Sequence, residues 1–275
     1  MIYRLEGVMS FLRYLHKQMV WLAVLSFSLL GQQDAQRPVR DPQSLEIVRR
    51  TVQLAGGAQQ VLAIHDITEK GELQFHWGRG TKGPVTIKML GANRFRLDYE
   101  VPGHKSTLTV RDGFGFEQMD GKAVSISHPR AINLGNLSFP IAHCVAAVAD
   151  PQTEVSFVGI ESRNARSVYR VRLRGHLGLA VDARNTRPVT KELIIDALTY
   201  DIVSVEDWPI SYVGSSDRAR SHVAQRQIDY SDFRLVNNVR LPFSIKIRVL
   251  GQETMTVLLN NISLNSNLRD DDFGP

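Results

Sequence analysis

The chain is poor in cysteine, since Cys144 is the only one among 275 residues. A single thiol excludes an internal disulfide framework and any zinc site built on several cysteines. Its neighbours at 141–148 are mainly apolar and typical of a short helix, so Cys144 is interpreted as a buried packing residue rather than a nucleophile. The adjacent His143 is not expected to form a dyad with it, because neighbouring helical residues do not face each other.

Motifs of common enzyme and metal-binding classes are also missing. No H-E-x-x-H pair and no G-x-S-x-G motif occurs, which removes the usual signals for a zinc protease or an α/β-hydrolase. Residues 78–83 fit G-x-G-x-x-G, but Pro84 and a predicted strand follow where a nucleotide-binding loop needs a helix, so they indicate a hairpin loop. Residues 270–272 lack the glycine-centred loop of a calcium site and predict a solvated tail. We therefore predict no catalytic residue, no metal site, no cofactor and no enzymatic activity.

Large charge of one sign is absent as well. The formal net charge is only +5, and the basic residues are scattered rather than gathered in blocks, so nucleic-acid binding is not predicted. Such a mild surplus suffices for contact with an anionic membrane surface. Three basic residues alternate with apolar ones in one predicted strand and are interpreted as a solvated face: Arg170, Arg172 and Arg174.

The N-terminal segment carries an apolar run. Residues 19–30 are uncharged and follow Arg13 and Lys17, and polar residues come directly after them. This order is typical of a Sec-type signal peptide, so residues 1–36 are predicted to direct the chain to the periplasm or outside the cell. An inner-membrane anchor through residues 18–33 is the alternative. The cleavage position and the true start methionine stay open.

Two helices are predicted in the remaining chain, which is expected to form one domain over 37–275. Asp41 and Pro42 resemble an N-cap followed by proline at the first helical position, and Gly56-Gly57 provides a stop, so residues 42–55 predict an amphipathic helix. Residues 140–149 predict a second, small-residue helix.

Elsewhere the apolar residues alternate with polar ones, which is the pattern of strands with one buried face. The clearest case is the final hairpin, where Phe243, Ile245 and Ile247 precede the turn at Gly251-Gln252. About ten strands against two helices make a sheet too large to stay flat. We therefore predict a mainly β (α+β) fold: a curled antiparallel sheet that forms an incomplete barrel around a few short helices.

Several large apolar residues lie in the predicted strands and could be ordinary core or line a ligand cavity. A curled sheet with few helices needs something in its interior, which favours a cavity. The predicted lining is Phe75, Trp77, Phe95, Leu97, Tyr99, Phe114 and Phe116, with Arg94 and Arg96 at the rim.

The order of motifs resembles the lipoprotein-carrier superfamily typified by LolA and LolB. The motifs that carry it span nearly the whole chain after the signal segment: 54–57 (LAGG) with Val61 and Ile64, 94–97 (RFRL), 110–114 (VRDGF), 230–233 (YSDF), 239–243 (VRLPF), and Leu264-Asn265 followed by 271–273 (DDF). The stretch 207–226 departs from the compact carriers.

This resemblance implies an unclosed antiparallel barrel wrapped around helices, with an apolar cavity that takes acyl chains. The expected function is non-catalytic binding of a lipid, an acyl chain or a lipid-modified protein. The alternative is an envelope interaction or sensor module that presents an edge or the 207–226 stretch to a partner protein, and a hydrolase with an unrecognised site is the third reading. The sequence does not indicate the oligomeric state.

Overall fold

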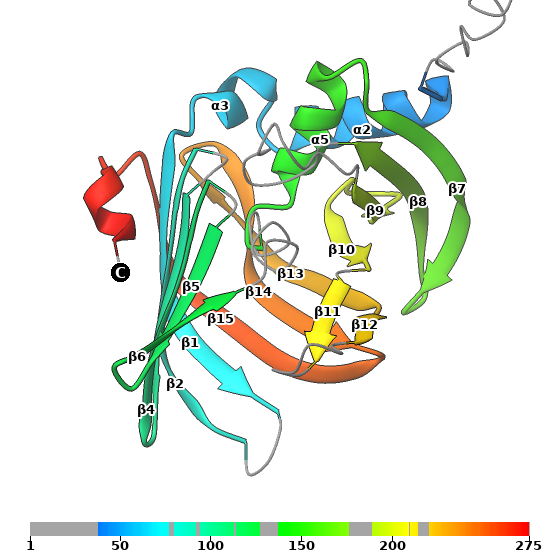
Figure 1. Ribbon diagram of the computed structural model, residues 1–275. Helices are drawn as coiled ribbons and strands as arrows, with labels where there is room; N and C mark the ends of the chain where they lie inside the picture. Colours follow the sequence, from blue (N-terminus) through cyan, green and yellow to red (C-terminus); the bar gives the residue numbers. More distant parts are fainter. Residues whose placement is uncertain are drawn as a thin grey trace, which may run out of the picture. The chain divides into compact units, whose positions relative to one another are not determined.

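The computed structural model describes residues 38–76, 80–91, 94–112, 114–126, 137–175, 189–208, 210–213 and 220–274 (Figure 1). The predicted signal segment at 1–36 and Trp77 lie outside these residues. From Val39 onward the described residues belong to one unit. Within the described ranges, no helix is both long and apolar enough to span a membrane.

The first helix, α2 (Pro42–Leu54), begins as its sequence predicts. The carboxylate of Asp41 accepts hydrogen bonds from the backbone N–H and the hydroxyl of Ser44, both at 2.7 Å, and Pro42 follows at the first position. Gly57 has a φ of +87°, and its N–H bonds to the carbonyl of Val52 at 2.9 Å, which ends the helix. The predicted helix at 42–55 is therefore confirmed. A short helix, α3 (Ala58–Leu62), comes next.

The strands form one large antiparallel sheet. The first six are consecutive hairpins: β1 (Asp66–Phe75), β2 (Lys82–Leu90), β3 (Arg94–Val101), β4 (His104–Arg111), β5 (Phe114–Met119) and β6 (Lys122–Ile126). After the helix α5 (Ile141–Ala149) come β7 (Glu154–Arg163), β8 (Arg166–Gly175), β9 (Val189–Asp196), β10 (Ile202–Asp207), β13 (Arg226–Val236), β14 (Val239–Val249) and β15 (Gln252–Leu264).

The sheet is joined through its first and last strands. The described strands follow the order β6-β5-β4-β3-β2-β1-β15-β14-β13-β10-β9-β8-β7, and β1 pairs with β15 along its length. The end strands β6 and β7 do not pair with each other, so the barrel stays incomplete, as predicted. The chain ends in a 3₁₀ helix, η1 (Asp270–Phe273). In the 207–226 stretch, β11 (Ile210–Val213) and β12 (Arg220–Val223) form a separate hairpin.

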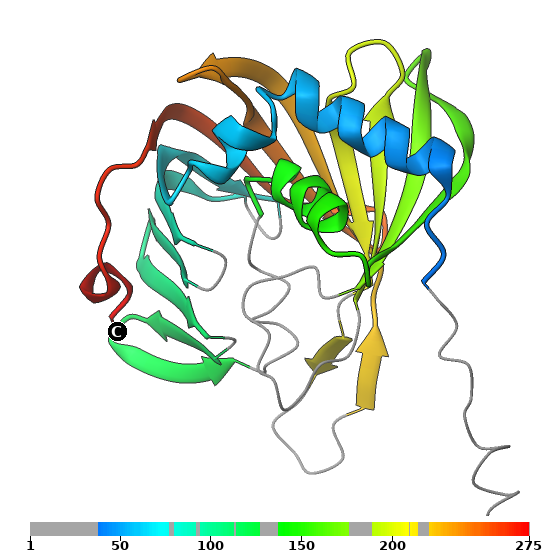
Figure 2. The ribbon, with the colours of Figure 1, turned by 90° about the horizontal axis from the view of Figure 1, so that it is seen from above.

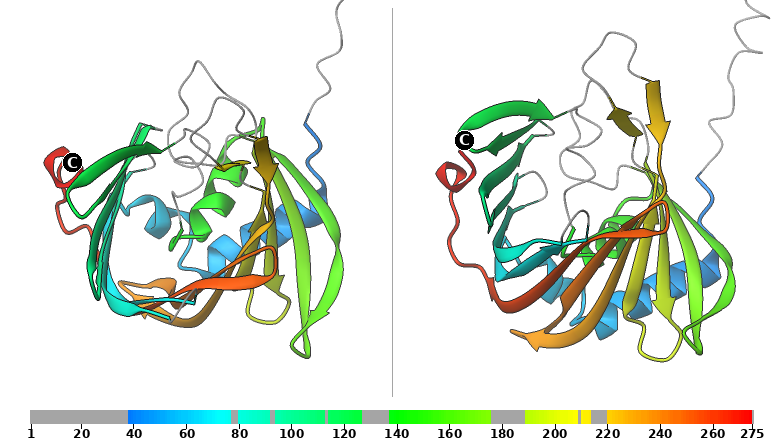
Figure 3. Two further views of the ribbon diagram at one scale, coloured as in Figure 1. Left: turned by 60° about the horizontal axis from the view of Figure 1, so that its bottom comes forward. Right: turned by 90° about the horizontal axis from the view of Figure 1, so that it is seen from below.

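The sheet curves around its helices. Figure 2 shows α2 crossing the strands and α5 lying in the hollow of the sheet, and Figure 3 shows the sheet as an arc with α5 inside it and η1 outside. We call the side of the sheet that faces α5 the inner face and the opposite side the outer face. Alternate residues of each strand occupy each face.

The inner face and the helices share one hydrophobic core. Ile141 and Cys144 of α5 are buried with strand residues such as Phe95, Leu193 and Ile245. Cys144 is fully buried, which confirms that this cysteine packs in the core, and burial raises the pKa of its thiol to about 12. The structure therefore agrees with the helix predicted at 140–149.

The bulge at Gly71 supplies a test of the join between β1 and β15. The register shifts between Lys70 and Gly71, and a Cβ on Gly71 would lie 2.1 Å from the backbone oxygen of Leu258 on β15. Gly71→Ala should therefore lower the free energy of unfolding by about 2–3 kcal/mol, because backbone must move to admit the methyl group. Urea denaturation followed by circular dichroism measures this. Ser125→Ala on the exposed strand β6 is the control and should cost less than about 0.5 kcal/mol; equal effects would contradict the role given to Gly71.

Candidate functional site

Four of the predicted lining residues lie together on the inner face. In the strand register Phe95 pairs with Met89, Leu97 with Ile87, and Tyr99 with Val85. Phe75 joins them through an edge-on contact with Tyr99, with ring centroids 5.3 Å apart. Phe75, Phe95 and Leu97 are buried in the core, and Tyr99 is partly exposed.

The other predicted aromatics do not join them. Phe114 lies opposite Arg111, which lies opposite Arg94, and Phe116 reaches Arg96 in the same way through Thr109. Residues paired directly across strands share a face, so Phe114 and Phe116 lie on the outer face with both arginines. They are exposed there. This corrects their placement in a lining, while Trp77 lies outside the described residues.

The predicted rim arginines hold the C-terminus instead of surrounding an opening. Arg94 bonds to the carboxylates of Asp112 at 2.5 Å and Asp270 at 3.1 Å, and Arg96 donates to the carbonyl of Gly274 at 3.0 Å. Lys88 adds an ion pair of 3.1 Å to Asp272. The run at 270–272 is thus a docked element and not the solvated tail that was predicted.

The inner face also has apolar side chains that the sequence analysis missed. Met119 pairs with Ser106, which pairs with Tyr99, so Met119 extends the Tyr99 row on the inner face. Val124 extends the Leu97 row through Glu117 and Leu108 in the same manner. Both side chains are exposed. The sequence signal for them is their alternation with polar residues in two short strands, which is weaker than that of the aromatic residues.

The other end of the inner face is filled. A cavity of about 20 Å³ remains where α2 and α5 meet the strands near Tyr200 and Phe233, which is room for about one water molecule. At the opposite end of this face the side chains of Met119 and Val124 are exposed and Tyr99 is partly exposed.

A buried ionic cluster lies under α5. Lys191 donates to the carboxylate of Asp207 at 3.0 Å, and Arg226 donates to it at 2.6 and 2.9 Å. Burial by itself raises the pKa of Asp207, but the two cations outweigh it and hold that pKa well below its ordinary value. Burial, aided by Lys191, lowers the pKa of His143 on α5, which keeps this histidine neutral.

This cluster makes a strong prediction about stability. Asp207→Asn leaves Lys191 and Arg226 buried without their carboxylate, so the free energy of unfolding should fall by about 3–5 kcal/mol. Chemical denaturation at neutral pH measures it. Asp232→Asn is the matched control, because Asp232 pairs with Arg234 at an exposed site, where an ion pair contributes little to stability. If Asp207→Asn lowers the free energy of unfolding no more than Asp232→Asn does, the stabilising role of the cluster is refuted.

Glu69 is a second buried acid on the inner side of β1. It lies opposite Ile87 and Ile262, and its Oε2 atom has no hydrogen-bond partner among the residues described. Burial raises its pKa to about 7, and nearby Ser138 lowers it only in part.

The pKa of Glu69 predicts a pH dependence of stability. The folded chain holds this proton more tightly than the unfolded chain, whose glutamate titrates near 4.5. Stability should therefore fall as the pH rises from about 4.5 through about 7, by roughly 3 kcal/mol in all. Glu69→Gln should remove this loss, so the variant gains on the parent protein between pH 5 and pH 8 in denaturation experiments. A constant difference between the two proteins across that range would contradict the assignment.

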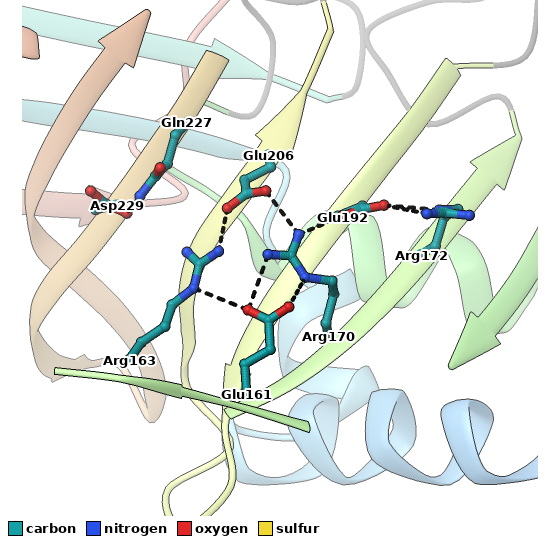
Figure 4. Close-up of polar contacts among 8 residues, drawn as sticks. All are labelled: Glu161, Arg163, Arg170, Arg172, Glu192, Glu206, Gln227 and Asp229. Carbon is teal, nitrogen blue, oxygen red and sulfur yellow. Dashed lines mark hydrogen bonds and ion pairs between the residues drawn. The ribbon is translucent and has the colours of Figure 1, made fainter. Parts of the chain in front are cut away.

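The outer face carries an ionic network across four strands (Figure 4). Arg170 of β8 bonds to Glu161 at 2.5 Å, to Glu192 at 2.5 Å and to Glu206 at 2.8 Å. Arg163 of β7 also bonds to Glu206, at 2.5 Å. Arg170 is largely buried, so the solvated face predicted for the three alternating arginines is wrong for this one, while Arg172 and Arg174 are exposed.

This network is a rigid framework rather than an acid–base site. Hydrogen bonding to Arg170 is the main cause that lowers the pKa of Glu161. Burial raises the pKa of Glu206, but Arg163 and Arg170 outweigh it and the pKa is lowered. Carboxylates held ionised in this way do not exchange protons near neutral pH. In the ranges that the structure describes, no group of three or more His, Cys, Asp or Glu residues is arranged to hold a metal ion.

Comparison with solved structures agrees with the curled-sheet fold described above. No family model and no curated protein matches the chain. Among solved structures, it is similar to a LolA superfamily protein from Nitrosomonas europaea, with 10% identity, a TM-score of 0.50, and coverage of 84% of this chain and 98% of that one. A domain assigned to outer-membrane lipoprotein sorting in Vibrio parahaemolyticus gives 10% identity, a TM-score of 0.48, and coverage of 84% and 96%. The resemblance to LolA-like proteins predicted from the order of motifs is thus confirmed for the fold.

Proposed function

We propose that the chain is an exported, non-catalytic binding protein whose inner face takes a lipid, an acyl chain or a lipid-modified protein. One observation carries the proposal: the buried apolar row of the inner face continues into the exposed side chains of Met119 and Val124. Apolar groups left exposed beside a core mark a surface that gains from being covered. The fold shared with a LolA superfamily protein supports this reading.

The free energy gained by burying an acyl chain is large enough for useful affinity. Each methylene group removed from water contributes about 0.8 kcal/mol, so a chain of ten methylenes laid on the inner face offers about 8 kcal/mol before the costs of association. In the proposed complex the partly exposed Tyr99 contacts such a chain, and the ring of Phe75 packs edge-on against Tyr99.

The chemistry of the site favours binding over catalysis. The thiol of Cys144 has its pKa raised to about 12 and lies in the core, and burial keeps His143 neutral. The acids of the outer network are held ionised by arginines. A partner-protein or sensor role is the alternative; the exposed Trp208 beside the separate β11–β12 hairpin favours it.

Two matched substitutions test the proposal. The full chain, purified gently and studied by native mass spectrometry with solvent extraction, should carry a lipid or take up a fluorescent fatty acid. Met119→Asp, on the inner face and 41% exposed, should weaken uptake about tenfold or more, since a charge replaces apolar contact. Phe116→Asp, on the outer face and 50% exposed, should leave uptake unchanged.

Two outcomes would count against the proposal. A protein without bound lipid that takes up no fatty acid would favour the interaction module instead. Equal effects of the two substitutions would show that uptake, although real, does not occur on the inner face.

A further inference from the structure

The outer face has a groove of about 790 Å³, on the side of the sheet away from α5. Its floor is formed by polar side chains of β10, β13 and β14, including Ser204, Gln227 and Ser244. Their strand neighbours Val205 and Ile228 belong to the core on the inner face, so the groove and the apolar row are on opposite sides of one sheet. Figure 4 shows Gln227 beside Glu206 at the edge of the ionic network.

The floor holds a hydroxyl group that lacks a partner. Ser204 is 2% exposed, and its Oγ atom has no hydrogen-bond partner in the part of the chain that the structure describes. A buried hydroxyl without a partner is unfavourable. Because Ser204 lines the groove, a ligand oxygen seated there would satisfy it.

The walls of the groove carry a surplus of positive charge. Arg163 and Arg166 come from the β7–β8 hairpin, Lys246 and Arg248 from β14, and the acids among the lining residues are only Asp196 and Asp229. Arg248 is paired with Asp229 and Lys246 with Glu253. Arg163 is likewise paired with Glu206, so Arg166 is the lining cation with the most freedom to receive an anionic group.

Arg166 is the cation best placed to receive that group. Its side chain is 68% exposed and reaches Asp196 only at 3.6 Å. Asp196 already accepts the backbone N–H groups of Leu198 at 2.8 Å and Thr199 at 2.9 Å. Both of these bonds go to Oδ1 of Asp196, whereas Arg166 faces Oδ2. A guanidinium has five N–H donors, so Arg166 can stay beside Asp196 and donate to a ligand as well. Arg163, by contrast, is held by Glu206 and gives the wall a fixed position.

The character of the floor distinguishes between ligand classes. It crosses strands β10, β13 and β14, whose backbone groups are paired with neighbouring strands, so an extended peptide finds no free strand edge to join. Side-chain hydroxyls and an amide are what the floor offers, and these suit a ligand that brings many hydroxyl groups. The volume lies in the range of about 300–1,000 Å³ that is usual for small ligands.

We propose that this groove binds a short acidic saccharide, with a carboxylate at Arg166 and hydroxyl groups on Ser204, Gln227 and Ser244. The site goes beyond apolar ligand binding and uses the opposite face of the sheet. Loss of either activity therefore leaves the other intact.

Titration calorimetry on the full chain tests the proposal with trigalacturonate and its methyl ester, in which added methyl groups remove the negative charges while the sugar hydroxyls stay the same. The ester should bind about tenfold more weakly or not at all. Arg166→Gln should weaken trigalacturonate binding about tenfold, and Ser204→Ala about threefold. Arg174→Gln is the matched control, because Arg174 is 54% exposed, reaches Glu154 at 3.5 Å and lies outside the groove. It should bind like the parent protein.

Thermal unfolding verifies that each variant is folded, and fatty-acid uptake should be the same in all of them. The proposal is overturned if trigalacturonate does not bind at millimolar concentration, if the ester binds equally well, or if Arg166→Gln and Arg174→Gln behave alike. An acidic hexapeptide that binds where trigalacturonate does not would assign the groove to a partner protein and overturn the saccharide.

Discussion

The pairing of β1 with β15 is the contact on which the rest of the structure depends. It joins the hairpins of β1 to β6 to the strands of the second half of the domain. The two paired strands lie near opposite ends of the described sequence. Without it the strand order would divide into a six-stranded part, β1 to β6, and a seven-stranded part, β7 to β10 with β13 to β15. With it, one twisted sheet curls far enough to bury α5. The bulge at Gly71 lies in this join and allows the two strands to approach closely.

Electrostatics then distinguishes the two faces of the second half of the sheet. On the inner face, Lys191, Asp207 and Arg226 form a cluster that is costly to bury and stable only while complete. On the outer face, Arg170 ties β7, β9 and β10 together through three carboxylates. Strand β10, which carries Ser204 of the groove, is therefore held by ion pairs on both faces, which preorganises a site built on it.

Much of the fold could be predicted from local sequence. The N-cap at Asp41, the glycines after α2 and the alternation in 243–259 each act over a few residues, so their signals survive in the sequence alone. The charged residues show where such reasoning ends. Arg170 alternates with apolar residues as a solvated arginine does, and only the pairing of β8 with β9, and of β9 with β10, brings Glu192 and Glu206 to it.

The candidate site was predicted in part for the same reason. Phe95, Leu97 and Tyr99 share a strand, so period two places them on one face without further information. Phe114 and Phe116 belong to another strand, and their face depends on the register across β4, which fixes Phe114 against Arg111. A shift of one residue in this register would have placed Phe114 and Phe116 on the inner face. Local pattern thus groups residues within a strand, while long-range pairing decides which groups meet.

The two-sided use of each strand has a consequence for function. In β13, Tyr230 points inward and bonds to the carbonyl of Leu137 at 2.9 Å, while Gln227 and Asp229 point outward. The same strand therefore supports the core on the inner face and forms part of the floor of the polar groove on the outer face. Because successive side chains point to opposite faces, substitutions one residue apart change different faces, so the inner face and the groove can be altered separately while they share one backbone.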